Sequence, residues 1–229
     1  MLKSDFTETG RTGQMEGEPR RFPTDTGGLS IFTHMRYIMS FHWNEGDFDI
    51  FMKALRYASL QHSDQRRKGG SQKPYINHPI QVTEILWQSG EVTDAATLVA
   101  AMLHDTVEDT GSKPEEIAAL FGEDVRGLVM EVTDDKSLPK QVRKDLQIKH
   151  APDKSRRARQ IKLADKISNV TEMAYDPPKD WTRQRRREYL DWTEQVIDGL
   201  RGENPRLEAL YDQALAEARK LLAEEDACV

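Results

Sequence analysis

The sequence predicts an all-α protein, a helical bundle, and three observations lead to that prediction. Apolar residues recur at spacings of three and four over most of the chain after residue 45. The strict alternation of apolar and polar residues that is typical of a half-buried strand does not occur. Gly and Pro residues divide the periodic stretches into segments of ordinary helix length. We therefore expect antiparallel helices joined by short loops.

The individual helices follow from their capping signals. Pro79 suits the first turn of one helix, and Gly90 suits its end. Thr93 is a good N-cap for the next helix, which we expect to reach residue 109 as one piece and to end before Gly111. In chain order, the expected helices cover residues 47–62, 79–87, 94–109, 112–122, 123–132, 139–149, 155–173, 183–200 and 205–223.

The first 44 residues differ from the remainder. They combine several Gly residues with Thr, Pro and charge, and their apolar periodicity is weak. We expect residues 1–44 to form a poorly ordered N-terminal extension and residues 45–225 to form the folded domain. Met35 and Met39 precede the first periodic segment, so a later translation start is compatible with the sequence.

Composition excludes several classes of protein. With 33 Lys and Arg against 39 Asp and Glu, the net charge of the 229 residues is −6, which disfavours general nucleic-acid binding. The longest apolar run, residues 95–103, is shorter than the roughly 20 residues that span a bilayer. Cys228 is the single cysteine, so the chain has no intrachain disulfide or cysteine zinc site. We expect a cytoplasmic protein that binds neither nucleic acid nor membrane, as a monomer or a homodimer.

The most informative segment is an acidic cluster at the end of an apolar stretch. On a helix, Asp105, Glu108 and Asp109 would lie within an arc of about 140° that begins at His104. Carboxylates at this spacing repel each other, and the end of a helix disfavours anions. The apolar residues 95–103 indicate burial, and buried negative charge needs a cation. A divalent metal meets that need, whereas the plain alternative is a solvated acidic helix end.

Further metal ligands must come from distant parts of the chain. His78 precedes a proline, which places it at a corner between a loop and a helix. Asp165 lies one helical turn before Asn169 in an apolar helix. Alone, a histidine in this position is more often structural, and an aspartate such as Asp165 is more often an ion-pair partner. Together with His104 and Asp105 they form a nitrogen and oxygen ligand set, which suits an octahedral ion such as Mn²⁺ better than structural Zn²⁺.

The short motifs around these residues, and the order of the motifs along the chain, resemble a known family. His104-Asp105 with distant His78 and Asp165 resembles the HD-domain metal-dependent phosphohydrolases. The surrounding sequence more narrowly resembles the hydrolase domain of the RelA/SpoT alarmone enzymes, and most of all the stand-alone small alarmone hydrolases of the metazoan type, the MESH-like subgroup. The matching segments span roughly residues 45–215. They are QRRK (65–68), YINHP (75–79), LHDTVEDT (103–110), VTDDKSLP (132–139) and KLADKISN (162–169), together with Phe121-Gly122, Trp181, Glu188-Tyr189, Trp192 and Gly199-Leu200.

The resemblance implies an HD-type fold and Mn²⁺-dependent hydrolysis of the guanosine nucleotides ppGpp and pppGpp. Pyrophosphate leaves the 3′ position in that reaction, and GDP or GTP remains. The chain is too short to carry the synthetase and regulatory domains of the larger enzymes. The matching positions imply metal ligands His78, His104, Asp105 and Asp165, a catalytic acidic pair Glu108 and Asp109, and nucleotide-binding residues Arg67, Lys68 and Asn169.

Charge elsewhere in the chain is compatible with such a substrate. Residues 66–68 and the basic residues of 136–144 offer local positive charge in an acidic protein, although each stretch is also compatible with a solvated face. His62 is open to two interpretations, a core residue or a residue that supports the site. Two rival functions also stay open. One is an HD phosphohydrolase for another nucleotide such as NADPH, and the other is a non-catalytic alarmone-binding module.

Overall fold

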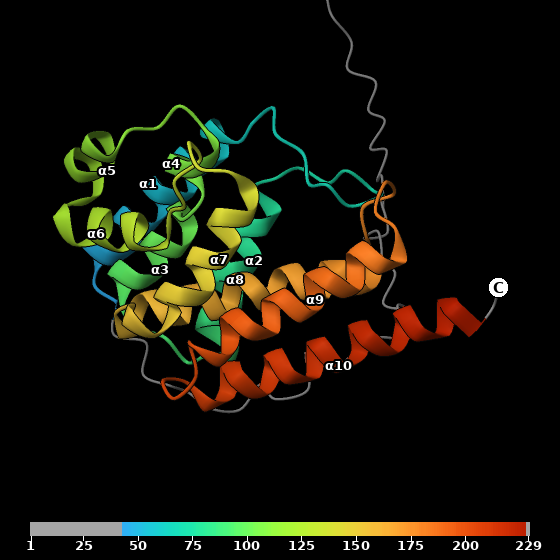
Figure 1. Cartoon of the computed structure of the whole chain (residues 1–229). Helices are drawn as coiled ribbons and strands as arrows, with labels where there is room; N and C mark the ends of the chain where they lie inside the picture. Colours follow the sequence, from blue (N-terminus) through green and yellow to red (C-terminus); the bar gives the residue numbers. More distant parts are fainter. Residues whose placement is uncertain (1–42, 228–229) are drawn as a thin grey trace, which may run out of the picture. The chain divides into compact units, whose positions relative to one another are not determined.

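The computed structural model describes residues 43–227, and over that range the chain is a bundle of α-helices without a β-strand (Figure 1). One isolated bridge pairs Arg66 with Pro74. The all-α prediction is therefore confirmed for the described residues. The predicted N-terminal extension lies almost wholly outside them.

The helix bounds agree closely with the predicted segments. A π-helical turn, Ile85–Ser89, continues α2, and a 3₁₀ turn, Ala151–Asp153, follows α7. The α-helices are α1 (Glu45–Gln61), α2 (Asn77–Glu84), α3 (Ala95–Leu103), α4 (Thr106–Asp109), α5 (Pro114–Phe121), α6 (Glu123–Val132), α7 (Lys140–His150), α8 (Arg156–Tyr175), α9 (Arg183–Asp198) and α10 (Pro205–Ala227).

Local chemistry explains where several helices begin. Helix α1 starts two residues earlier than predicted because Asn44 forms a capping box with Asp47: each side chain accepts a hydrogen bond from the other residue's backbone amide. The Ser155 side chain caps α8 in the same manner at Ala158. Gly122 joins α5 to α6 with φ of +89°, a conformation that favours glycine and permits the sharp turn.

Two predictions about one helix are wrong. Its N-cap is Asp94 rather than Thr93, because the Asp94 carboxylate accepts a hydrogen bond from the Thr97 backbone amide. The expected single helix over residues 94–109 is two helices, α3 and α4, with a turn at His104 and Asp105 between them. Asp105 has φ of −100° and ψ of −4°, in the sparsely occupied bridge region where active-site residues are often found. The break removes the acids from the end of the apolar helix and lets two consecutive side chains, His104 and Asp105, lie against the same point.

Two helices form the centre of the domain. All residues of α3 from Thr97 to Leu103 are buried, which fits the apolar composition of that helix. Twelve of the 20 residues of α8 are buried, and α8 packs against α2, α6, α9 and α10 (Figure 1). Because α8 is covered on several sides, its polar residues lie inside the domain. Among the helices of residues 43–227, none combines the length and apolar composition needed to cross a membrane.

Candidate active site

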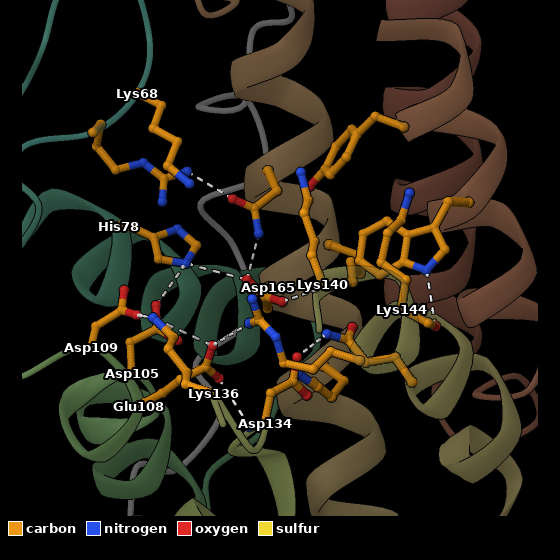
Figure 2. Close-up of a pocket in the computed structure, with 18 of the residues that line it drawn as sticks. Lys68, His78, Asp105, Glu108, Asp109, Asp134, Lys136, Lys140, Lys144 and Asp165 are labelled. Carbon is orange, nitrogen blue, oxygen red and sulfur yellow. Dashed lines mark hydrogen bonds and ion pairs between the residues drawn. The ribbon is translucent and has the colours of Figure 1, made fainter. Parts of the chain in front are cut away.

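A cavity of about 680 Å³ lies between α2, the turn before α4, α7, α8 and α9 (Figure 2). Nine Lys or Arg and six Asp or Glu side chains line it, although the whole chain has a net charge of −6. Both predicted basic stretches contribute to this lining, through Arg67 and Lys68 and through residues 136–144. An excess of positive charge concentrated in one cavity of an acidic protein indicates an anionic ligand.

The four predicted metal ligands lie together at one end of the cavity. His78 Nε2 is 3.2 Å from Asp165 Oδ1 and 3.6 Å from Asp105 Oδ2. His104 Nε2 is 3.1 Å from Asp105 Oδ2 and 4.0 Å from Asp165 Oδ1. Ligand atoms of His78, His104 and Asp165 all lie within 4.8 Å of one another. Side chains separated by nearly ninety positions thus converge on one point.

Hydrogen bonds fix the two imidazoles with Nε2 directed at this point. His104 Nδ1 donates to the carbonyl oxygen of Ala101 at 2.8 Å. His78 Nδ1 donates to Ser168 Oγ at 2.9 Å, and Ser168 in turn donates to Gln81 Oε1 at 2.8 Å. Both Nδ1 atoms therefore carry the proton, which leaves Nε2 as the electron-pair donor.

The residues present fit a divalent metal ion. His104 Nε2 is buried and has no partner of hydrogen-bond geometry, although Asp105 Oδ2 is only 3.1 Å away. Two imidazole nitrogens and two carboxylates offer the mixed donor set of a first-row divalent cation. Tyr75 donates a 2.6 Å hydrogen bond to Asp105 Oδ2, and Asn169 donates one of 2.6 Å to Asp165 Oδ1, so both carboxylates are held in place.

The electrostatics of the cluster favour positive charge at His104. Burial lowers the pKa of His104, but the adjacent Asp105 carboxylate outweighs burial and raises this pKa to about 9. Burial lowers the pKa of His78, and the Asp165 carboxylate only partly offsets that effect. A proton and a divalent ion therefore compete for His104 Nε2.

The predicted acidic pair borders this cluster on α4. Glu108 Oε2 accepts a hydrogen bond from the backbone amide of Asp134 at 3.0 Å, and burial raises the pKa of Glu108. Asp109 Oδ2 accepts from Gln65 Nε2 at 3.0 Å, and Asp109 Oδ1 pairs with Lys136. The Glu108 carboxylate thus has a raised proton affinity, whereas donors hold Asp109 on both of its oxygens.

His62 supports this arrangement from the core. It is 1% exposed, and its Nδ1 lies 2.6 Å from Gln65 Oε1. Because Gln65 uses its amide nitrogen toward Asp109, its oxygen must accept the proton of His62 Nδ1. The His62 ring also stacks on Tyr75, with 4.8 Å between centroids. The sequence could not choose between the two interpretations of His62, and the hydrogen bond favours the supporting role.

The three predicted nucleotide-binding residues have different environments. Lys68 is exposed at the cavity. Arg67 forms an ion pair with Glu172, donates to Asn169 Oδ1 at 2.7 Å and lies 5.4 Å from the Tyr75 ring centroid. Asn169 connects Arg67 to Asp165 through its own amide. Arg67 is therefore also part of the frame that holds Asp165, a role that sequence reasoning missed.

Several other lining residues were not predicted as site residues. Trp181, Tyr189 and Trp192 form an aromatic wall, with 5.5 Å between successive ring centroids. Arg185 lies 4.3 Å from the Trp181 centroid, and Lys166 lies 4.8 Å from the Trp192 centroid. The sequence did contain a sign of the three aromatic residues, because they are among the residues that carry the family resemblance. Glu172 had no such signal, because one acid on a helix is usually a surface residue.

Comparisons with known proteins identify the family of this chain. The HD domain family matches residues 54–191. The guanosine-3′,5′-bis(diphosphate) 3′-pyrophosphohydrolase MESH1 of Drosophila melanogaster is 50% identical over 71% of this chain and 91% of its own length. The human protein of the same name is 47% identical over 69% of this chain and 88% of its own length.

A solved structure gives the same result for the fold. It is that of a metazoan ortholog of SpoT, described as hydrolysing ppGpp and as having a role in starvation responses. Its TM-score is 0.72 at 48% identity, and the match covers 75% of this chain and 96% of that one. The chain therefore belongs to the HD-domain family and, within it, to the MESH1 group of guanosine-3′,5′-bis(diphosphate) 3′-pyrophosphohydrolases.

Proposed function

We propose that this chain hydrolyses ppGpp and pppGpp at the 3′ position, with GDP or GTP and pyrophosphate as products. Water forms the new bond to phosphorus, the bond from phosphorus to the 3′-oxygen breaks, and that oxygen takes a proton. The observation that carries the proposal is the convergence of His78, His104, Asp105 and Asp165 beside an acidic pair, at one end of a cavity with cationic and aromatic walls.

We propose Mn²⁺ as the divalent ion and the four converging side chains as its ligands. The two imidazole nitrogens and two carboxylates would hold such an ion and are the donor types that suit Mn²⁺. When bound, such an ion acts as a Lewis acid toward water and the phosphoryl group. Hydrogen bonds from Tyr75 and Asn169 keep the two carboxylates oriented toward it.

The two residues of the acidic pair, Glu108 and Asp109, have different roles in the reaction. Glu108 accepts the proton of the attacking water, because burial gives it a higher proton affinity than an ordinary glutamate. Asp109 orients that water or assists the leaving group, since Gln65 and Lys136 hold its carboxylate in one position.

The opposite part of the cavity suits a guanosine nucleotide. The aromatic wall of Trp181, Tyr189 and Trp192 offers surfaces for a base, and Lys68 and residues 136–144 offer charge for phosphates. Asn169, one turn after Asp165, can donate to or accept from the sugar.

The test is pyrophosphate release from ppGpp by the purified chain with Mn²⁺, repeated with EDTA. We expect turnover with Mn²⁺ and none with EDTA, and metal analysis of the purified protein should find an ion at the site. NADPH serves as the competing substrate. Turnover of NADPH without turnover of ppGpp would contradict the proposed substrate, and binding of ppGpp without any product would indicate a non-catalytic module.

A further inference from the structure

One lysine of the central helix has an environment that a structural lysine does not have. Lys162 is 6% exposed and lies on α8, one turn before Asp165, in the wall of the cavity. Lys162, Lys166 and Asn169 lie on one stripe of that helix because they are spaced by four and three residues. The Lys162 ammonium is therefore inside the domain and next to the metal cluster.

The Lys162 ammonium has no counter-ion among the described side chains. None of their carboxylate oxygens lies within 4.0 Å of its nitrogen, and no hydrogen bond holds it. Two neighbouring lysines, one buried and one half-buried, do have such partners. Lys166 Nζ lies 3.1 Å from Asp165 Oδ2, and Lys154 Nζ donates to the carbonyl oxygen of Glu131 at 2.5 Å.

The Lys162 ammonium is available to a ligand in the cavity. The aliphatic part of the side chain is packed inside the domain, and the charged end lies at the cavity wall. The charge of Lys162 interacts with the carboxylates of Glu108 and Asp165, one at the proposed base and the other at the metal cluster. The ammonium therefore belongs to the region where water, base and phosphate must meet.

We infer that Lys162 is a further catalytic residue, which binds an unesterified oxygen of the phosphoryl group under attack. This inference rests on the proposed function. As water adds to phosphorus and the bond to the 3′-oxygen breaks, negative charge on the phosphoryl oxygens is met by an ammonium already in position. Lys162 transfers no proton in this step: Glu108 takes the proton of the water.

The main test replaces the charge with a side chain of similar size, Lys162→Met. We expect kcat to fall by about 100-fold or more, as for the loss of one preorganised oxyanion donor. Metal content should stay unchanged, because Lys162 is not a ligand. Lys162→Arg should restore part of the activity, since it keeps the charge. Lys149→Met removes the same charge from an exposed position of α7 away from the cavity and should match the wild type.

Thermal unfolding in EDTA separates a catalytic from a structural lysine. Because Lys162 forms no ion pair within 4.0 Å among the described residues and methionine has a similar volume, Lys162→Met should keep Tm within about 2 °C of the wild type. Loss of a structural lysine would lower Tm by more than that. Lys162→Gln, measured in parallel, covers the case in which the methionine variant does not fold.

Inorganic pyrophosphate provides a readout that does not depend on turnover. With Mn²⁺ present, pyrophosphate should raise the Tm of the wild type and raise that of Lys162→Met distinctly less. A wild type that does not cleave ppGpp would overturn the proposed function, while the two Tm measurements would still decide the role of Lys162. Wild-type kcat in Lys162→Met, or a Tm lowered by more than about 2 °C, would overturn the assignment of Lys162.

Discussion

The position of Asp105 makes it the most sensitive single residue of the metal cluster. Its Oδ2 lies within 3.6 Å of both imidazole Nε2 atoms and accepts the Tyr75 hydroxyl. We expect Asp105→Ala to lose bound metal and to lower kcat by about 100-fold or more, because Lewis-acid assistance contributes several kcal/mol. Metal analysis and pyrophosphate release measure the two effects. Asp49→Ala, on an exposed turn of α1, is the control, and an active Asp105→Ala would contradict the metal cluster.

The environment of Glu108 predicts the acid side of the pH profile. Burial raises its pKa above that of an ordinary glutamate, and a base works only when ionised. Activity should therefore fall as pH decreases through this raised pKa, at a higher pH than the ordinary value of about 4.3 would give. Glu108→Gln should lower kcat by about 100-fold or more, and its residual activity should lack this limb. The kcat/KM profile of both proteins is the measurement. An unchanged limb in the variant would assign it to another group.

The Gln65 amide links the core histidine to the acidic pair. Its two ends contact His62 Nδ1 and Asp109 Oδ2. Gln65→Leu should lower kcat by about 10-fold with little change in KM, because Asp109 loses one of its two orienting donors. In the same variant, His62 loses its acceptor, which ¹H–¹⁵N NMR can detect as a change of tautomer. Equal kinetics in the variant and the wild type would show that the link does not position Asp109.

At the scale of elements, the loop between α1 and α2 packs against Asp176, the C-cap residue of α8. Ser71 donates its amide to Asp176 Oδ1 at 2.9 Å, and Gly69 lies against the same residue. A Cβ at position 69 would lie 2.6 Å from the Asp176 carbonyl oxygen, so the backbone must move. The same loop carries Arg67 and Lys68, so a shift there also moves the nucleotide side of the cavity.

We therefore expect Gly69→Ala to cost about 1–3 kcal/mol of stability and to raise KM for ppGpp. The thermal unfolding curve and steady-state kinetics measure these effects. Gly111→Ala is the matched control, because a Cβ there meets no atom within 4 Å. A Gly69→Ala protein with wild-type Tm and KM would show that this loop adjusts without consequence.

At the scale of the molecule, the site draws its residues from within residues 65–192, which are part of the unit from Phe41 to Val229. We expect a variant that lacks residues 1–40 to keep its Tm within about 2 °C and its kcat within about twofold, since all of the site residues described above follow residue 61. The measurement is side-by-side unfolding and turnover of the two chains. A large loss of either quantity would assign residues 1–40 a role in folding or catalysis.

The sequence alone determined the fold class, most helix bounds and the residue types of the cluster. These depend on local chemistry: apolar periodicity, capping residues, and the unfavourable stacking of Asp105, Glu108 and Asp109 in one helix. The break at His104–Asp105 was missed, because its residues are compatible with a helix and only the contacts with His78 and Asp165 favour the turn.

Only the tertiary structure decided which distant side chains meet. Glu172 holds Arg67, Gln65 holds Asp109, and Lys162 lies beside the cluster with no ion pair to any carboxylate of residues 43–227. The sequence could not predict these contacts, because a Lys, Gln or Glu side chain on a helix or loop is ordinarily exposed to solvent. Burial by α9 and α10 around α8 changes the cost of each such charge, and that cost is set by packing rather than by neighbours in the chain.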